Sequence, residues 1–433
     1  MLLRVLAASL ALGGILLAGC ISQGQSAPPA ASQVAQAQPV MALAAFQRSL
    51  EALRAGRIER VSVLQIGDSH TAGDHFSGRL RELLQERFGN GGRGMMPPGY
   101  PFPYWRPYQV EVNQKGSWQV LSSNNTNYPQ VPFGISGFIT QSRRAGDTMN
   151  LAADSGFDSA DIDFFRSPAG GHFSILVDGR PVEEVDTRGH PWELARKSIV
   201  TNGAGSLQIR TRGDGTVAIA DWAVYRRERG VVLSSMGFSG AQIGIMDHWD
   251  ANNVARQLRE MSPALIILAF GTNEGFDPPA VLGDYEAVFA SRLAQLRQMM
   301  PSASIAVVGP PDANRLPSYC GLRGPQADKA GCQPLTANQS ANYGEMLAHR
   351  DRSLCHWHTP TGIAIVRAAQ QRASRAAGVF FWDWASVQGG ECGASSWVAQ
   401  GLQRGDHVHM YEAGYGQSAE RLFAELMRGY RGR

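Results

Sequence analysis

The most informative segment of the chain reads Val61-Ser-Val-Leu-Gln-Ile-Gly-Asp-Ser-His70, a branched apolar run that stops at a short polar sequence. Residues 61–66 predict a buried strand, because branched apolar side chains fill most of the run. Apolar residues at helical spacing over 77–88 predict a helix, which the glycines within 89–94 end. Ser69 is therefore expected at the carboxyl end of a strand, where open α/β sheets hold their ligands.

A similar alternation of strands and helices returns after residue 231. Continuous apolar runs are typical of parallel strands that are covered on both faces. Such runs predict strands at 264–270, 304–308 and 379–383. Helices are predicted over about 284–300, over 362–377 before Gly378, and from about 415 onward.

Residues 104–229 have a different pattern. Short apolar segments at 162–165, 173–177, 206–210 and 217–220 are separated by turn sequences such as Asp178-Gly179 and Asp214-Gly215. Many short strands without helical periodicity predict a β-sandwich. The simplest architecture is a three-layer α/β domain, formed by residues 41–104 and 231–433, with a β-sandwich inserted at residues 105–230.

The first 40 residues predict export. Arg4 precedes an apolar run that ends in Leu17-Ala-Gly-Cys20, and the run is too short for a typical membrane span. Its end resembles a bacterial lipobox, which implies a signal peptide over 1–20 and a lipid on Cys20; the alternative is an ordinary cleaved signal peptide. Residues 21–40 are rich in Ala, Gln, Ser and Pro and predict a flexible tether. Because Ile21 rather than Asp follows Cys20, the lipobox resemblance implies an outer-membrane anchor that faces the periplasm.

The composition narrows the class of partner. The 433 residues are 43% hydrophobic and 18% charged, with a formal net charge of +3. These values are typical of folded domains, and no Lys/Arg cluster predicts binding to nucleic acid.

The other four cysteines of this exported chain are Cys320, Cys332, Cys355 and Cys392. An even number of cysteines outside the cytoplasm predicts two disulfides, for which three connectivities exist. We favour Cys320–Cys332, which closes a short loop, together with Cys355–Cys392. The alternative is a metal site that includes the sequence Cys355-His-Trp-His358, although the chain has no CxxC pair of the kind zinc sites use.

Ser69, His409 and Asp406 together can perform nucleophilic catalysis. A serine hydroxyl is a weak nucleophile until a base accepts its proton, and His409 near the C-terminus is a suitable base. Asp406 precedes His409 by three residues and can hold the imidazole in the required tautomer. His407 is the competing base, and Ser69 could instead cap a helix.

A developing oxyanion needs hydrogen-bond donors that are already in place. The backbone N–H groups of Ser69 and Gly240 can supply two, and the side-chain amide of Asn273 can supply a third. Gly240 lies in Met236-Gly-Phe-Ser-Gly-Ala241, and Asn273 lies in Gly271-Thr-Asn-Glu274 directly after a predicted strand. Gly237 is the alternative to Gly240 as the glycine that donates its backbone N–H, and Asn273 could be a simple turn residue.

Four segments therefore carry the candidate residues Ser69, Gly240, Asn273, and Asp406 with His409. Their order along the chain resembles that of the SGNH (GDSL-type) hydrolases, a family with a flavodoxin-like parallel sheet. The resemblance covers about 41–104 and 231–433, and it requires no metal or organic cofactor. It implies these site residues: nucleophile Ser69, base His409, acid Asp406, and oxyanion donors Ser69, Gly240 and Asn273. The sequence departs from the family pattern at Glu274, where Asp is usual, and at His70, where many relatives have Leu.

The longer sequence from Gly67 to Leu80, with Phe88-Gly-Asn-Gly-Gly-Arg-Gly94, Ser239-Gly-Ala-Gln242 and Gly309-Pro-Pro-Asp312, is similar to bacterial peptidoglycan O-acetylesterases and their O-acetyltransferase relatives. Those proteins also carry an inserted β-sandwich of the carbohydrate-binding-module type. The resemblance implies that the partner is an acetylated cell-wall glycan and that the 6-O-acetyl group of muramic acid is removed. The alternatives are acetyl transfer by the same residues, an esterase for another polysaccharide or a lipid, and a non-catalytic wall-binding lipoprotein.

Overall fold

The computed structural model describes residues 41–125 and 127–432. The predicted signal peptide, the predicted lipidation site Cys20 and the predicted tether to residue 40 lie outside the described residues. No helix in the described part of the chain combines the length and the apolar character needed to cross a membrane.

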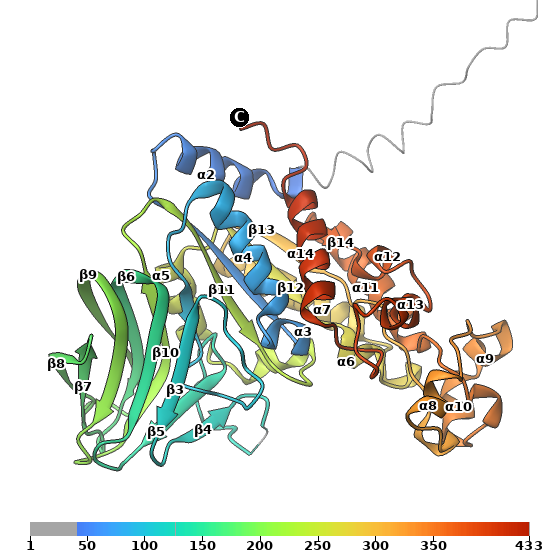
Figure 1. The fold of residues 1–433 in the computed structure, drawn as a ribbon, viewed down its shortest axis with the longest axis horizontal. Coiled ribbons are helices and arrows are strands. Elements are labelled where there is room, and N and C mark those ends of the chain that lie inside the picture. The colour runs from blue at the N-terminus through green and yellow to red at the C-terminus, as the bar shows by residue number, and fades with distance from the viewer. Residues whose placement is uncertain (1–40, 126, 433) are drawn as a thin grey trace, which may run out of the picture.

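A five-stranded, wholly parallel sheet forms the centre of the α/β part (Figure 1). Its strand order is β11-β1-β12-β13-β14, which is the 2-1-3-4-5 order of flavodoxin-like folds and confirms the predicted fold class. The strands are β1 (Arg60–Gly67), β11 (Gly230–Gly237), β12 (Leu265–Ala269), β13 (Ser304–Val308) and β14 (Phe380–Trp382).

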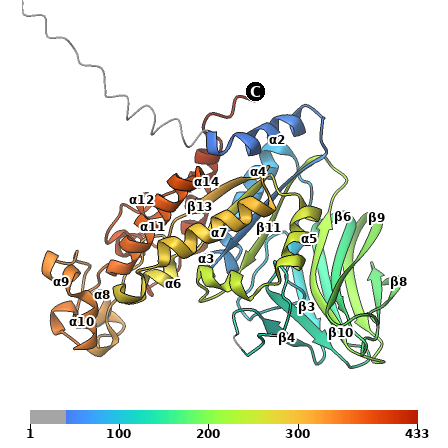
Figure 2. The ribbon, with the colours of Figure 1, turned by 180° about the vertical axis from the view of Figure 1, so that it is seen from behind.

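Helices cover both faces of this sheet. Successive side chains of a strand point to opposite faces, so each strand contributes to two separate cores. In β1, Val61 and Val63 pack against α2 (Ala44–Arg54), α4 (His75–Phe88) and α14 (Glu412–Leu426). Leu64 and Ile66 face the other core, which holds α5 (Ala251–Met261), α7 (Tyr285–Met299) and α11 (Thr361–Ala377). The result is the predicted three-layer arrangement, visible from behind in Figure 2.

An antiparallel sheet interrupts the α/β part between β1 and β11 and confirms the inserted sandwich-like domain. Its order is β4-β5-β10-β6-β9-β7-β8, with β2 added to β10 and β3 to β6. The strands are β2 (Gly94–Met96), β3 (Val110–Lys115), β4 (Gln119–Ser122), β5 (Phe138–Ser142), β6 (Thr148–Arg166), β7 (His172–Val177), β8 (Arg180–Asp186), β9 (Glu193–Thr211) and β10 (Val217–Tyr225).

The junction between the two sheets lies earlier than the predicted boundary at residue 105. Strand β2 pairs with β10 of the inserted sheet, while the Met95 N–H donates to Ser234 Oγ of β11. Phe165 and Ala220 of the inserted sheet belong to the same apolar cluster as Ile66 of β1. The inserted domain is therefore packed firmly against the α/β part.

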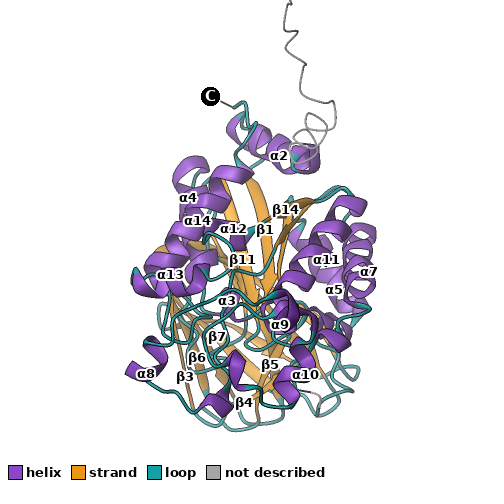
Figure 3. Ribbon diagram, turned by 90° about the vertical axis from the view of Figure 1, so that its right-hand side faces the viewer, coloured by secondary structure: helices purple, strands orange, loops and turns teal. Residues whose placement is uncertain are grey.

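Short elements around the sheet complete the fold (Figure 3). Near the carboxyl ends of the strands lie α3 (Ser69–Ala72), α6 (Thr272–Gly275) and the 3-10 helix Ile243–His248. The remaining short helices are Pro279–Val281, Ser318–Cys320, α8 (Pro325–Asp328), α9 (Ala337–Ala341), α10 (Tyr343–Ala348), Arg352–Leu354, α12 (Trp384–Val387) and α13 (Gly393–Ala399).

The disulfides are Cys320–Cys355 and Cys332–Cys392, so the pairing we favoured is wrong. The chain after Cys332 forms α9 and α10 and then returns. Trp357 forms an isolated β-bridge with Cys332, and Cys355 is thereby brought to Cys320. All four sulfur atoms are used in these bonds. The described residues also contain no group of three or more His, Cys, Asp or Glu side chains arranged to hold a metal ion.

Candidate active site

The four predicted segments meet at one edge of the parallel sheet. Ser69 begins α3 one residue after β1 ends, and Asn273 lies in α6 after β12, which is the neighbour of β1 in the sheet. Ser69, Gly240, Asn273 and His409 all line one cavity of about 520 Å³. Its wall also includes Tyr104, which lies between β2 and β3 of the inserted sheet.

Ser69, His409 and Asp406 form a continuous hydrogen-bonded chain. His409 Nε2 lies 2.9 Å from Ser69 Oγ, and His409 Nδ1 lies 2.9 Å from Asp406 Oδ2. The other oxygen of Asp406 accepts the backbone N–H groups of Val408 and His409, each at 2.9 Å. This geometry can activate the serine hydroxyl as a nucleophile and orient its base.

Asp406 is held in its charged form. Its partial burial by itself raises the pKa, but the hydrogen bonds from His409 and from two backbone N–H groups outweigh burial and hold the pKa well below its usual range. A charged Asp406 favours a proton on His409 Nδ1, which leaves Nε2 free to accept the proton of Ser69.

The predicted oxyanion donors lie around the same cavity. Ser69 is the first residue of α3, where a backbone N–H has no partner within the helix. Gly240 has φ of 73°, a backbone conformation that glycine adopts without strain. Asn273 Nδ2 donates to Ala241 O at 2.8 Å, and an amide NH₂ has a second hydrogen for an oxyanion.

The competing residues have other structural roles. Gly237 lies within β11, and a Cβ there would come within 2.1 Å of Ala72 N, so this glycine allows close packing on α3. A Cβ at Gly240 would meet nothing within 4 Å. The cap of α3 is Asp68 rather than Ser69, because an Asp68 oxygen accepts the His70 N–H at 3.0 Å.

His70 and His75 differ in their relation to the cavity. His70 is buried, with its Nδ1 2.9 Å from Tyr415 Oη, and burial lowers its pKa to about 3. It is therefore neutral at physiological pH. His75 lines the cavity and stacks on Tyr415, with ring centroids 5.9 Å apart.

Two buried carboxyl groups lie under the site. Burial raises the pKa of Asp68 to about 6 and that of Glu274 to about 7. Glu274 Oε1 accepts the Ile243 N–H at 2.8 Å, just beyond the Gly240 segment. Glu274 thus anchors the segment that carries Gly240.

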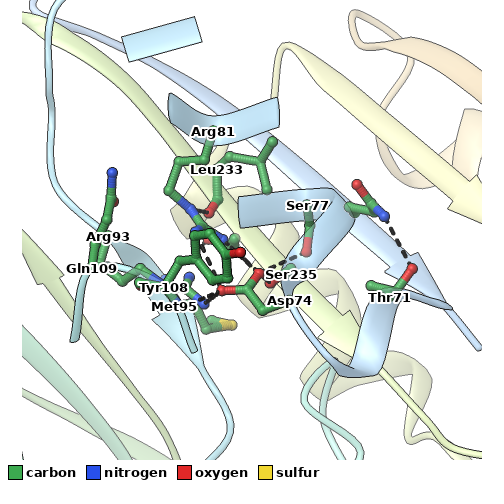
Figure 4. A network of polar contacts seen from close by, with 12 residues as sticks. Thr71, Asp74, Ser77, Arg81, Arg93, Met95, Tyr108, Gln109, Leu233 and Ser235 are labelled. Carbon is green, nitrogen blue, oxygen red and sulfur yellow. Dashed lines mark hydrogen bonds and ion pairs between the residues drawn. The ribbon is translucent and has the colours of Figure 1, made fainter. Parts of the chain in front are cut away.

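A buried ion cluster follows the nucleophile, and sequence reasoning did not identify it (Figure 4). Asp74 contacts Arg81 at 3.0 Å and Arg93 at 2.9 Å, with all three side chains almost fully buried. Ser77 and Ser235 also donate to Asp74 Oδ1. Burial alone raises the pKa of Asp74, but the two guanidinium groups hold it well below its usual range. The cluster joins α4, the segment before β2, and β11.

The fold and the site together resemble those of the SGNH hydrolases. A scan of family models and a search of curated proteins found no match to the chain. Among solved structures, a peptidoglycan O-acetylesterase is 27% identical, with a TM-score of 0.69 over 89% of this chain and 96% of the other. This likeness supports an esterase or acyl-transfer activity.

A second structural neighbour is more distant. A family two carbohydrate esterase from Clostridium thermocellum, in complex with cellohexaose, is 13% identical and has a TM-score of 0.28. The match covers 72% of this chain and 100% of that one. At this score the similarity carries no argument about function.

Proposed function

We propose that the protein is a serine esterase that removes O-acetyl groups from peptidoglycan through an acetyl-Ser69 intermediate. The observation that carries the proposal is the 2.9 Å contact between Ser69 Oγ and His409 Nε2 at the wall of an open cavity. The structural likeness to a peptidoglycan O-acetylesterase supports the acetylated glycan as substrate.

The first half of the reaction forms the acyl-enzyme. Ser69 Oγ attacks the acetyl carbonyl carbon while its proton passes to His409 Nε2, and charge develops on the carbonyl oxygen. The N–H groups of Ser69 and Gly240 and the Asn273 amide stabilise that oxygen. His409 then gives its proton to the departing sugar oxygen, which leaves as a hydroxyl and leaves acetyl on Ser69.

Water completes the reaction. His409 accepts a proton from the water that attacks the acetyl carbonyl, and it returns this proton to Ser69 Oγ as acetate leaves. The side chain of His409 is 37% exposed and that of Asp406 is 47% exposed, so solvent has access to the base.

The proposed location matches the substrate. The Leu17-Ala-Gly-Cys20 sequence favours an exported protein with a lipid on Cys20, anchored in the outer membrane and facing the periplasm. The enzyme would then act on the peptidoglycan from the membrane.

A comparison of substrates tests the proposal. Acetate release is measured with O-acetylated peptidoglycan and with acetylated xylan, for the wild-type chain and for Ser69→Ala. We expect release from peptidoglycan alone, and only by the wild type. Equal release from xylan contradicts the substrate, and unchanged release by Ser69→Ala contradicts the catalytic assignment. Addition of a glycan acceptor separates the two reactions, since more acetylated acceptor than free acetate contradicts hydrolysis.

A further inference from the structure

The loop that follows β4 in the inserted domain contacts the segment that carries Gly240 through a hydrogen bond. Asn124 lies in this loop, and its Nδ2 donates a hydrogen bond to Ser239 O at 2.9 Å. Ser239 and Gly240 both line the cavity that contains Ser69. A side chain of the inserted domain therefore contacts the peptide unit that joins Ser239 to Gly240.

That peptide unit lies at the centre of a β-turn. The Ala241 N–H donates to Phe238 O at 3.2 Å, which closes a four-residue turn with Ser239 and Gly240 as its central residues. Gly240 has φ of 73°, as the third residue of a type II turn requires. Rotation of the central peptide converts type II into type I, and glycine accepts the backbone of either form.

The direction of this peptide decides whether Gly240 can serve as an oxyanion donor. In a trans peptide, the Ser239 carbonyl and the Gly240 N–H point in opposite directions. A hydrogen bond that holds Ser239 O on one side therefore fixes the Gly240 N–H on the other. Within the described chain this N–H donates to no protein atom, so it is available to a substrate oxygen.

The loop that carries Asn124 is itself anchored. His248 Nδ1 lies 2.6 Å from Ser123 O, and Trp249 Nε1 donates to Ser123 Oγ at 3.1 Å. Both partners belong to the α/β part, just after the Gly240 segment. Because these two contacts hold Ser123, they also fix the backbone of the next residue, Asn124, whose side-chain amide contacts Ser239.

We propose that Asn124 is a positioning residue, supplied by the inserted domain, which holds the Ser239–Gly240 peptide with the Gly240 N–H directed at the oxyanion. The inference rests on the proposed function. It gives the inserted domain a part in catalysis, separate from any role in glycan binding.

The test measures hydrolysis of p-nitrophenyl acetate by the full chain. Loss of one hydrogen bond to Ser239 lowers the population of the correct peptide orientation, so Asn124→Ala should reduce kcat roughly fivefold with KM unchanged. Asn124→Asp should reduce kcat further, because its carboxylate repels the carbonyl oxygen. The pH profile of kcat should keep its midpoint, because the Ser69–His409–Asp406 chain is untouched.

The matched control is Asn113→Ala, which removes an exposed asparagine of the same domain whose Oδ1 accepts a hydrogen bond from Asn150. It should retain the wild-type kcat. Wild-type kcat in both Asn124 variants, with hydrolysis abolished in Ser69→Ala, overturns the positioning role alone. A rise in KM without loss of kcat also overturns it, as does a fall in kcat that matches a fall in the folded fraction. Unchanged hydrolysis by Ser69→Ala overturns the proposed function as well.

Discussion

The ring of His407 is stacked on the ring of Trp357, with centroids 3.6 Å apart and planes inclined by 10°. His407 Nδ1 also lies 2.9 Å from Ser395 Oγ. These contacts hold His407 on the side of the disulfide-linked segment, whereas His409, two residues later, contacts Ser69. The two histidines of this segment therefore have separate roles.

The first prediction separates these two histidines. His409→Ala should lower kcat for acetyl ester hydrolysis by at least about a thousandfold, because no other base contacts Ser69 in the described residues. His407→Gln should keep kcat within about twofold and lower the melting temperature, since stacking on Trp357 is lost. Steady-state kinetics and thermal unfolding of both variants check this, and a large loss of kcat in His407→Gln would reverse the assignment.

The second prediction concerns the buried ion cluster. Asp74→Asn leaves Arg81 and Arg93 buried without a countercharge, which should destabilise the fold by about 3–5 kcal/mol. Denaturant unfolding measures the change. The control is Glu86→Gln, whose exposed contact with Arg79 at 3.5 Å should contribute less than about 1 kcal/mol. A similar small loss in both variants would show that the cluster is not a major source of stability.

The third prediction is a pH dependence of stability caused by Glu274. Burial raises the pKa of Glu274 to about 7 in the folded chain, above the value of the unfolded chain. Its favourable contribution is therefore complete below about pH 4 and is lost as the pH rises through 7. The loss should be on the order of 3 kcal/mol, because one pKa unit corresponds to about 1.4 kcal/mol.

Glu274→Gln tests this directly, since the amide oxygen can still accept the Ile243 N–H. The free energy of unfolding is measured between pH 4.5 and 8 for both chains. The free energy of unfolding should fall less steeply with pH in the variant. Part of the slope that remains is due to Asp68, whose pKa is raised to about 6. Parallel curves for the two proteins would be inconsistent with a buried, neutral Glu274.

The fourth prediction is the disulfide pairing. Peptide mapping of the unreduced protein should recover Cys320 linked to Cys355 and Cys332 linked to Cys392. Because the second bond closes a longer loop, 60 residues against 35, its removal should cost slightly more stability. Recovery of a Cys320–Cys332 peptide would contradict the fold of this segment.

The parallel sheet and most of the site could be predicted from the sequence. Residues 61–66 and 264–270 are apolar runs that end in polar sequences, and carboxyl ends of parallel strands share one edge. That rule places Ser69 beside Asn273 without any knowledge of tertiary contacts. Asp406 and His409 are close in sequence, so their contact required only the correct choice between two histidines.

Strand β11 was missed for a physical reason. It contains Ser234 and Ser235, which are buried, and buried hydroxyls weaken an apolar pattern. Their partners are Met95 N–H and Asp74, which lie far away in sequence. The disulfide pairing and the Asn124 contact were likewise unpredictable, because each depends on how separate segments dock.

Acetate release from O-acetylated peptidoglycan is the most direct test of the central claim. The wild-type chain should release acetate, and Ser69→Ala should release none above background while remaining folded, because the proposed reaction passes through acetyl-Ser69. Undiminished acetate release by Ser69→Ala, or none by the folded wild-type protein, would contradict an esterase that works through acetyl-Ser69.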